Sequence, residues 1–267
     1  MSVQIRNNVK VSGDGPATLF FAHGFGCDQN MWRLLQPAYA KCYRTVLFDL
    51  VGSGMSDLSA YDKKKYDTLQ GYADDVLDIV KEFARGPCVF VGHSVSAMIG
   101  MLADIKAPGV FIAHAMVCPS PSYINDGDYV GGFERKDIDS LLETMEANYL
   151  GWSSNMAPVI MGAPDRPELG VELTNSFCRT DPEIAKHFAR VTLLSDNRAD
   201  LPKLTTPALI LQSSDDLIAP VAVGAYMQRV LPRGTLKIID NVGHCPHLSA
   251  PGPSTDAINA FLAEQGL

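Results

Sequence analysis

The stretch that decides the fold is CVFVGHSVSAMIG, residues 88–100. A short run of β-branched and apolar residues ends at Gly92, and a helix-favouring run begins directly after Ser94. This pattern predicts a strand, a tight turn that carries a serine, and a helix. In the pattern G-x-S-x-G such a turn is strained and lifts the serine hydroxyl above a sheet. Ser96 stands where that pattern has its second glycine, and it still offers the small side chain that close packing of the helix on the strand requires.

Further short apolar runs, each bounded by Gly, Pro or Asp, lie on both sides of this segment and are typical of buried strands. Together with the strand in the opening stretch, the predicted strands are Thr18–Ala22, Thr45–Asp49, Cys88–Gly92, Ile112–Cys118, Ala208–Gln212 and Thr235–Ile239. Apolar residues at helical spacing from Leu69 to Phe83, and again from Ser94 to Ile105, predict crossover helices between them. Alternating strands and helices indicate an α/β fold with a mostly parallel central sheet and helices on both faces.

The alternation of predicted strands and helices stops after Pro121. Residues 122–196 show helical periodicity without a convincing strand, and the strand pattern resumes at Ala208. We therefore expect one domain, with a core of residues 1–121 and 197–267 and a helical lid of residues 122–196. A closing helix over Thr255–Gln265, with Ser254 as its N-terminal cap, is predicted at the end.

Composition and charge narrow the class of protein. The chain has 267 residues, 46% of them hydrophobic, which is enough to bury one substantial core. A formal net charge of -8, with no basic run longer than Lys63–Lys65, argues against nucleic acid and against anionic membrane surfaces as partners. No apolar stretch approaches the ~20 residues that span a bilayer, and the first residues lack a secretory signal. Six scattered cysteines without metal-type spacing favour a reduced, cytoplasmic protein without structural zinc.

A serine becomes a nucleophile only when a histidine takes its proton and a carboxylate orients that histidine. In the strand-turn-helix arrangement the acid and the histidine follow the serine along the chain, on loops at the ends of later strands. The strand ending at Gln212 is followed by Asp215 and Asp216, and the strand ending at Ile239 is followed by His244. The sequence therefore predicts a catalytic site formed by Ser94, Asp216 and His244.

Two of these residues have a neighbour of the same type. Asp215 stands next to Asp216, and one of the two can be a solvated turn residue. Asp216 is preferred because it precedes an apolar pair and Pro220, which favours the buried end of the turn. His247 competes with His244 in the same way; His244 is preferred because Gly243 permits a tight approach of the backbone.

Acyl transfer also needs donors aimed at the developing oxyanion. The amide of Val95, directly after the nucleophile, is the first candidate. The strand Thr18–Ala22 ends in His23-Gly24-Phe25-Gly26, where two glycines let the backbone turn, so the amide of Phe25 is the second. The glycine-rich loop of residues 49–57 lacks the lysine of a phosphate-binding loop and is interpreted as a structural turn.

Seven blocks of the sequence resemble the RsbQ-like family of α/β-hydrolases, which includes a bacterial stress-response regulator, and they are similar to the plant karrikin and strigolactone receptor hydrolases. The similarity covers essentially the whole chain. The blocks are HGFGCDQNMW (23–32), LFDLVGSGMSDL (47–58), VGHSVSAMIGMLA (91–103), YINDGDYVGGFE (123–134), FCRTDPEIA (177–185), ILQSSDDLIAP (210–220) and GHCPHLS (243–249).

This resemblance implies an α/β-hydrolase with a four-helix cap, the triad named above and an apolar pocket. By matching positions, the pocket is expected to be lined by Phe25, Tyr123, Phe133, Met156, Leu193, Leu217 and Ile218. Met156 and Leu193 stand where the plant receptors have aromatic residues, so the ligands of those receptors are not carried over.

We expect a serine hydrolase that cleaves a small apolar ester or lactone through an acyl-serine intermediate, with no metal or organic cofactor. The alternative is an RsbQ-like or receptor-like sensor that binds or slowly hydrolyses a small hydrophobic ligand and signals to a protein partner. A triad is common to both, so the residues alone leave the choice open.

Overall fold

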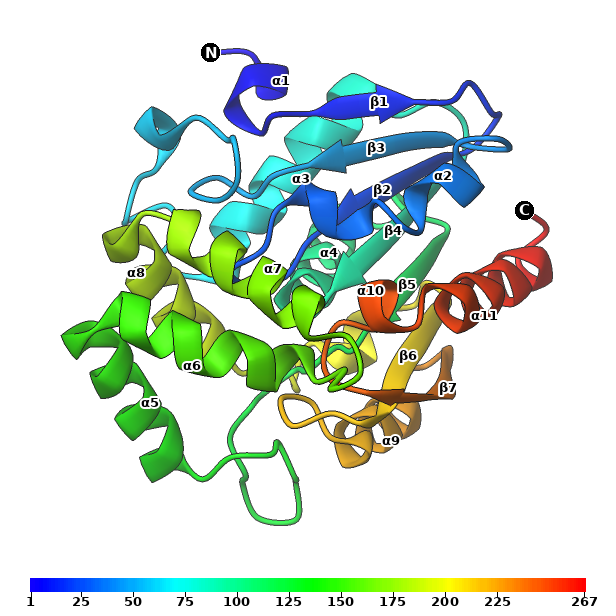
Figure 1. Cartoon of the computed structure of the whole chain (residues 1–267). Helices are drawn as coiled ribbons and strands as arrows, with labels where there is room; N and C mark the ends of the chain where they lie inside the picture. Colours follow the sequence, from blue (N-terminus) through cyan, green and yellow to red (C-terminus); the bar gives the residue numbers. More distant parts are fainter.

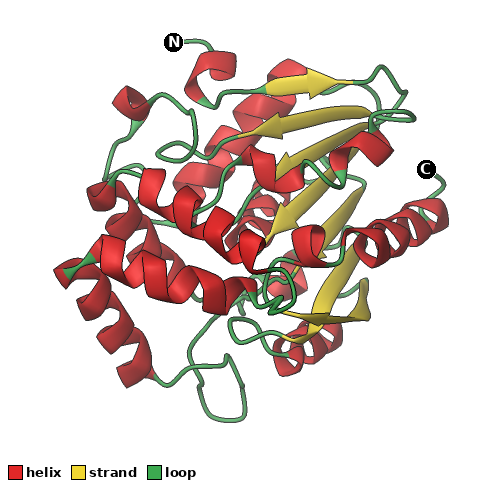
Figure 2. Cartoon of the chain, viewed as in Figure 1, coloured by secondary structure: helices red, strands yellow, loops and turns green.

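The computed structural model describes the whole chain, Met1–Leu267. At its centre is a seven-stranded sheet with the order β1-β3-β2-β4-β5-β6-β7 (Figures 1 and 2). β1 pairs antiparallel with β3, and every other neighbouring pair is parallel. The predicted α/β class with a mostly parallel sheet is confirmed. The strands are β1 (Lys10–Ser12), β2 (Thr18–Ala22), β3 (Arg44–Phe48), β4 (Cys88–His93), β5 (Ala113–Val117), β6 (Ala208–Asp215) and β7 (Gly234–Val242).

The eleven α-helices lie around this sheet. They are α1 (Val3–Arg6), α2 (Gln36–Tyr39), α3 (Leu69–Phe83), α4 (Val95–Lys106), α5 (Arg135–Ala147), α6 (Tyr149–Met161), α7 (Pro167–Arg179), α8 (Pro182–Leu193), α9 (Val221–Val230), α10 (Pro246–Ser249) and α11 (Pro251–Glu264). Both crossover helices predicted from apolar spacing are present as α3 and α4.

The sheet is covered on both faces because successive side chains of a strand point to opposite sides. In β2, Phe20 joins a hydrophobic cluster with residues of α3, α4 and α9, whereas Leu19 and Phe21 join a second cluster with residues of α2 and α11. All five residues of β2 are buried, as expected of a central parallel strand. This core fixes the strand ends from which the functional loops emerge.

Helices α5 to α8 follow one another between β5 and β6, and they lie together over one end of the sheet (Figure 1). This number of helices agrees with the four-helix cap that the resemblance implied. A third hydrophobic cluster joins residues of α5, α6, α7 and α8 to four residues outside the lid, which are Cys27, Met31, Cys245 and Leu248. None of the helices combines the length and the apolar character needed to cross a membrane.

The last helix differs from the prediction. It begins at Pro251 rather than Thr255, and Ser254 lies inside it instead of capping it. Prolines are tolerated in a first helical turn because the amides there have no partner within the helix, so the helix includes Pro251 and Pro253. The Ser254 hydroxyl donates to the carbonyl of Pro246 in α10, which ties the two helices together.

Candidate active site

Ser94 lies at the turn between β4 and α4, as the opening stretch predicts. Its backbone has φ 55° and ψ -125°, a conformation that costs a non-glycine residue about 1–3 kcal/mol. The turn is tight because Gly92 leaves no room for a side chain: a Cβ there would lie 2.8 Å from the Ala97 nitrogen. Ser96 stands where the pattern has its second glycine. Its hydroxyl donates to the backbone carbonyl of His23, directly after β2, and so connects the turn to the end of that strand.

Ser94, His244 and Asp216 form a continuous chain of hydrogen bonds. The Ser94 Oγ lies 2.9 Å from His244 Nε2, and His244 Nδ1 lies 2.8 Å from Asp216 Oδ2. A carboxylate can only accept, so Nδ1 carries the imidazole proton and Nε2 has a lone pair directed at the serine hydroxyl. The other carboxylate oxygen, Oδ1, accepts from the amides of Ile218 and Ala219. These bonds hold the acid in the one orientation that keeps the histidine aligned.

The two neighbouring candidates lie elsewhere. Asp215 is exposed to solvent, whereas Asp216 is 5% exposed. His247 lies on α10 and is fully buried, but neither of its ring nitrogens has a hydrogen-bond partner. The preferences for Asp216 and His244 agree with the geometry.

Three further histidines make local contacts. His23 accepts the amide of Leu50 at Nε2, His114 pairs with the buried carboxylate of Asp104, and His187 contacts the hydroxyl of Tyr61. The loop of residues 49–57 is held through Asp49, whose carboxylate accepts from the amides of Gln29 and Met55. This agrees with its interpretation as a structural turn.

The two residues whose amides are predicted to face an oxyanion, Val95 and Phe25, lie next to the serine turn. Val95 is the first residue of α4, so its amide is among those that a helix leaves without an internal partner. The loop after β2 packs against the turn, because a Cβ on Gly24 would lie 3.2 Å from the Ser94 Cβ. Phe25 follows directly and lines the same cavity as Ser94.

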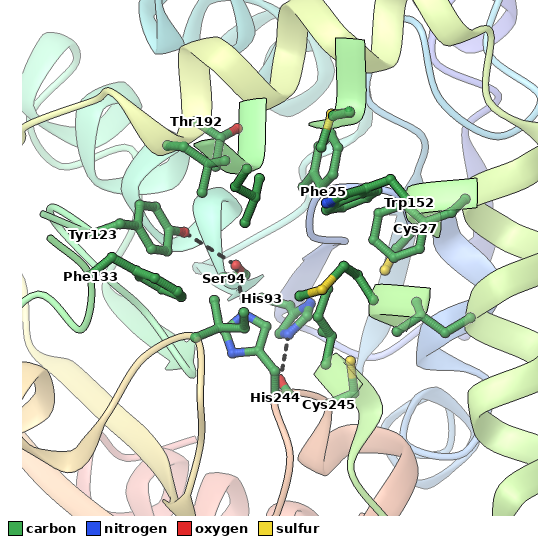
Figure 3. Close-up of a pocket in the computed structure, with 18 residues that line it drawn as sticks. Phe25, Cys27, His93, Ser94, Tyr123, Phe133, Trp152, Thr192, His244 and Cys245 are labelled. Carbon is green, nitrogen blue, oxygen red and sulfur yellow. Dashed lines mark hydrogen bonds between the residues drawn. The ribbon is translucent and has the colours of Figure 1, made fainter. Parts of the chain in front are cut away.

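A cavity of about 70 Å³ lies above Ser94, between the lid and the core (Figure 3). Fourteen of its eighteen lining residues are hydrophobic, so it favours apolar groups over charged ones. Five of the expected pocket residues from the lid and the acid loop line it: Tyr123, Phe133, Met156, Leu193 and Ile218. Its volume is well below the several hundred Å³ typical of sites for drug-sized ligands, so this conformation has room for a small group only.

Leu217 does not line the cavity, and this expectation was wrong. The side chain of Asp216 turns inward to meet His244, while Leu217, one position further on, is 56% exposed. The cavity is also lined by Ser94 and His244 of the catalytic chain and by residues outside the expected pocket lining, which are Cys27, His93, Leu141, Met145, Trp152, Ile160, Leu173, Phe177, Thr192 and Cys245. The spacing of Leu141 and Met145, four residues apart on one helical face, is a signal that could have found two of them.

Tyr123 is the second side chain in contact with the Ser94 hydroxyl. Its hydroxyl lies 3.5 Å from the Ser94 Oγ, at the limit of a hydrogen bond. Burial raises the pKa of Tyr123 to about 12, so the phenol remains protonated at neutral pH. It can therefore act as a donor on the side of Ser94 away from His244 (Figure 3).

The loop that carries His244 is held from two sides. His93 Nε2 lies 2.9 Å from the carbonyl oxygen of His244, and because a carbonyl only accepts, this nitrogen carries the proton. On the lid side, the amide of His244 donates to the carbonyl of Ile160 in α6. Gly243 has φ 104°, and a Cβ there would lie 1.9 Å from the carbonyl oxygen of Met161. The end of α6 and the histidine loop are therefore in direct backbone contact.

This fold and this arrangement of side chains are those of an α/β-hydrolase. A profile of the family described as "Alpha/beta hydrolase family" matches residues 19–256, and the chain belongs to that family. The match includes β2 to β7 and all of the residues that form the hydrogen-bonded chain.

Relatives that share much of the sequence include plant proteins. The chain is 41% identical over 251 residues to Karrikin insensitive 2 receptor CA of Petunia hybrida, covering 93% of each chain. It is 39% identical over 259 residues to Strigolactone esterase RMS3 of Pisum sativum, covering 96% of this chain and 97% of the relative. The relationship to plant receptor hydrolases is therefore confirmed.

Among solved structures, a hydrolase from Oleispira antarctica superposes with a TM-score of 0.94 at 43% identity, covering 98% of this chain and 96% of the other. An esterase from Exiguobacterium antarcticum superposes with a TM-score of 0.87 at 18% identity, covering 96% and 94%. The second similarity is one of fold. The hydrolase from Oleispira antarctica is similar in both sequence and structure.

Proposed function

We propose that this protein is a serine hydrolase that cleaves a small apolar ester or lactone through an acyl-serine intermediate. The observation that carries the proposal is the continuous chain from Ser94 through His244 to Asp216 at the wall of an apolar cavity. His244 takes the proton of Ser94 as the oxygen attacks the ester carbon, and it then gives that proton to the leaving alcohol. Water, deprotonated by the same histidine, releases the acid and restores the serine.

The amides of Phe25 and Val95 stabilise the oxyanion in both steps, and Tyr123 provides a further donor near the nucleophile. An oxyanion-hole donor typically contributes about 2.7–4 kcal/mol to transition-state stabilisation. The lid helices keep water away from the reacting atoms, which strengthens these electrostatic contacts.

The intact protein should be exposed to a panel of aryl esters and lactones of increasing size, quenched in acid and analysed by mass spectrometry. We expect a mass increase equal to the acyl group, located on Ser94 by peptide mapping, for acetyl and other small acyl groups. The variant Ser94→Ala is the control. An adduct that forms equally on Ser94→Ala would contradict the assignment of the nucleophile.

A second candidate function is that of a sensor, favoured by the relatives that are named as receptors and by the small cavity beneath the lid. A sensor turns over slowly and changes its lid or its stability when a ligand binds, and it acts on a protein partner. Single-turnover and steady-state rates distinguish the two: efficient turnover of a substrate favours a metabolic esterase, whereas fast acylation with very slow release favours a sensor.

A further inference from the structure

A second group of functional side chains lies behind the histidine loop. His247, on α10, has no exposed surface, and its ring packs against Trp32 and His93 with ring centroids 4.7 and 4.4 Å away. Neither ring nitrogen of His247 has a hydrogen-bond partner, and the Nδ1 of His93 also has none. Buried polar groups without partners are uncommon because each costs about 1–3 kcal/mol. One nitrogen of a neutral His247 carries a proton, so these rings present two lone pairs without a partner, one on each histidine, and the two lone pairs point to a ligand.

A thiol lies in the same place. One ring nitrogen of His93, one of His247 and the Sγ of Cys245 all lie within 4.8 Å of one another, and all three residues are buried. Figure 3 shows His93 and Cys245 next to each other near Ser94. Two imidazoles and a thiol are ligands that Zn²⁺ prefers. His93 Nε2 faces the carbonyl of His244, which leaves Nδ1 as the nitrogen free to bind an ion; a contact of this kind usually orients a metal-binding histidine.

We propose that His93, Cys245 and His247 form a binding site for Zn²⁺, and that occupation of this site inhibits the hydrolase. Such an ion is not a cofactor of the reaction proposed above. His93 and Cys245 both line the cavity above Ser94, so the ion reaches them by the route that substrate takes. When the ion binds, the Sγ–H bond of Cys245 breaks, an S–Zn bond forms and the proton goes to solvent. No oxidation or reduction takes place.

Inhibition follows from the positions of two ligands in the chain. His93 directly precedes Ser94, and Cys245 directly follows His244. Tetrahedral bonds of about 2.0–2.3 Å bring ligand atoms to roughly 3.4–3.8 Å from one another. The three ligand atoms now lie within 4.8 Å of one another, so binding draws the side chains together by no more than about 1.4 Å. This movement pulls on the neighbours of both the nucleophile and the base, whose 2.9 Å contact is needed for proton transfer.

The test uses Cd²⁺ as a spectroscopic probe and Zn²⁺ for inhibition, with the metal-free full chain. We expect one Cd²⁺ per chain to produce an ultraviolet thiolate-to-metal charge-transfer band. One equivalent of Zn²⁺ should slow hydrolysis of p-nitrophenyl acetate by about tenfold. A chelator should reverse this inhibition. Cys245→Ser should abolish the band, and His247→Gln should weaken Cd²⁺ binding by about 10–100-fold. The spectroscopic measurement needs no substrate, so its failure is distinct from a failure of the proposed function.

Two other cysteines serve as matched controls. Cys27 is buried and lines the same cavity, and Cys118 lies with Asp216 and His244 in another group of possible ligands. Cys27→Ser and Cys118→Ser should retain the band and the response to Zn²⁺. The proposal is overturned if wild type shows no thiolate band with excess Cd²⁺, or if the band is lost in Cys118→Ser or Cys27→Ser and kept in Cys245→Ser. Thermal unfolding of each variant without metal shows whether that variant is folded. If a variant is unfolded, the presence or absence of the thiolate band in wild type decides whether the proposal stands.

Discussion

At the scale of single residues, Ser94 offers the most direct test. Ser94→Ala removes one oxygen that is hydrogen-bonded to His244 Nε2 and leaves the strained turn with a residue of similar size. We expect the rate of p-nitrophenyl acetate hydrolysis to fall by several orders of magnitude, because loss of a triad nucleophile typically does so. The melting temperature should change little. A folded variant that keeps more than a tenth of the activity would refute Ser94 as the nucleophile.

The adjacent carboxylates provide a matched pair. Asp216→Asn replaces the acceptor of the His244 Nδ1 proton with a group that can present a donor, and a wrong tautomer costs about 10⁴ in rate. Asp215→Asn changes an exposed side chain and should leave the rate within about twofold. Steady-state rates with p-nitrophenyl acetate at a fixed pH measure both. A larger loss in Asp215→Asn would mean that the acid has been assigned to the wrong residue.

The sequence predicted these residues because their chemistry is local. Ser94 is identified by a turn within five residues, and Asp216 and His244 by their places after strands whose apolar runs are short and continuous. The lining of the cavity was harder to predict, since Cys27, Cys245 and Phe177 meet only after the lid has packed on the core. Leu217 was placed wrongly because its role was carried over by matching positions to the resembling family, whereas in this turn Asp216 and Ile218 face inward and Leu217 faces solvent.

At the scale of elements, the lid should decide substrate size. Phe133, just before α5, and Met156, on α6, line the cavity, so replacing both by alanine enlarges it. We expect the Michaelis constant to change more for long acyl chains and bulky lactones than for acetate. The preference of the enzyme should shift from acetate toward these larger substrates. Hydrogen exchange in α5 to α8, with and without a non-hydrolysable ester analogue, gives a second measurement.

Leu217→Ala is the control for this pair, because Leu217 is a large apolar residue of a neighbouring loop that lies outside the cavity. It should leave the order of substrates unchanged. Equal effects of the double variant on all substrates, with no protection of the lid by the analogue, would show that the lid does not select substrates.

The element boundaries that the sequence missed have a common physical cause. β1 is only three residues long and pairs antiparallel at the edge of the sheet, where burial does not impose an apolar run. α10 is a single turn stabilised by its contacts with α11, β7 and the 3₁₀ helix Gln29–Trp32, and short helices have little intrinsic stability. The central strands and α3 were predicted well because burial on one or both faces leaves a regular pattern of apolar residues.

At the scale of the whole molecule, alkaline pH should destabilise the fold through its buried tyrosines. Burial raises the pKa of Tyr149 to about 12, and its hydroxyl donates to the carbonyl of Phe177 across two lid helices. An unfolded chain releases this proton near pH 10, so the stability that Tyr149 contributes is complete below pH 10 and is lost as the pH rises toward 12. The loss is about 1.4 kcal/mol per pH unit for each such tyrosine.

Urea unfolding of wild type and Tyr149→Phe at pH 8 and pH 11 tests this. The variant should be less stable at pH 8 by about 0.5–1.5 kcal/mol, since it lacks one hydrogen bond. The difference should shrink at pH 11, because phenylalanine has no proton to lose. A difference that stays constant between the two values of pH would contradict the raised pKa of Tyr149.

The backbone contacts between the end of α6 and the loop of His244 link the lid directly to the proposed general base. The amide of His244 donates to Ile160, and Gly243 packs on the carbonyl of Met161. A force that lifts this end of α6 is therefore transmitted to the general base, whereas α5 has no such backbone bond to it. We expect a ligand that displaces α6 to slow the proposed hydrolysis and to change the outer surface of the lid, so that occupancy of the cavity and activity are coupled through one hydrogen bond.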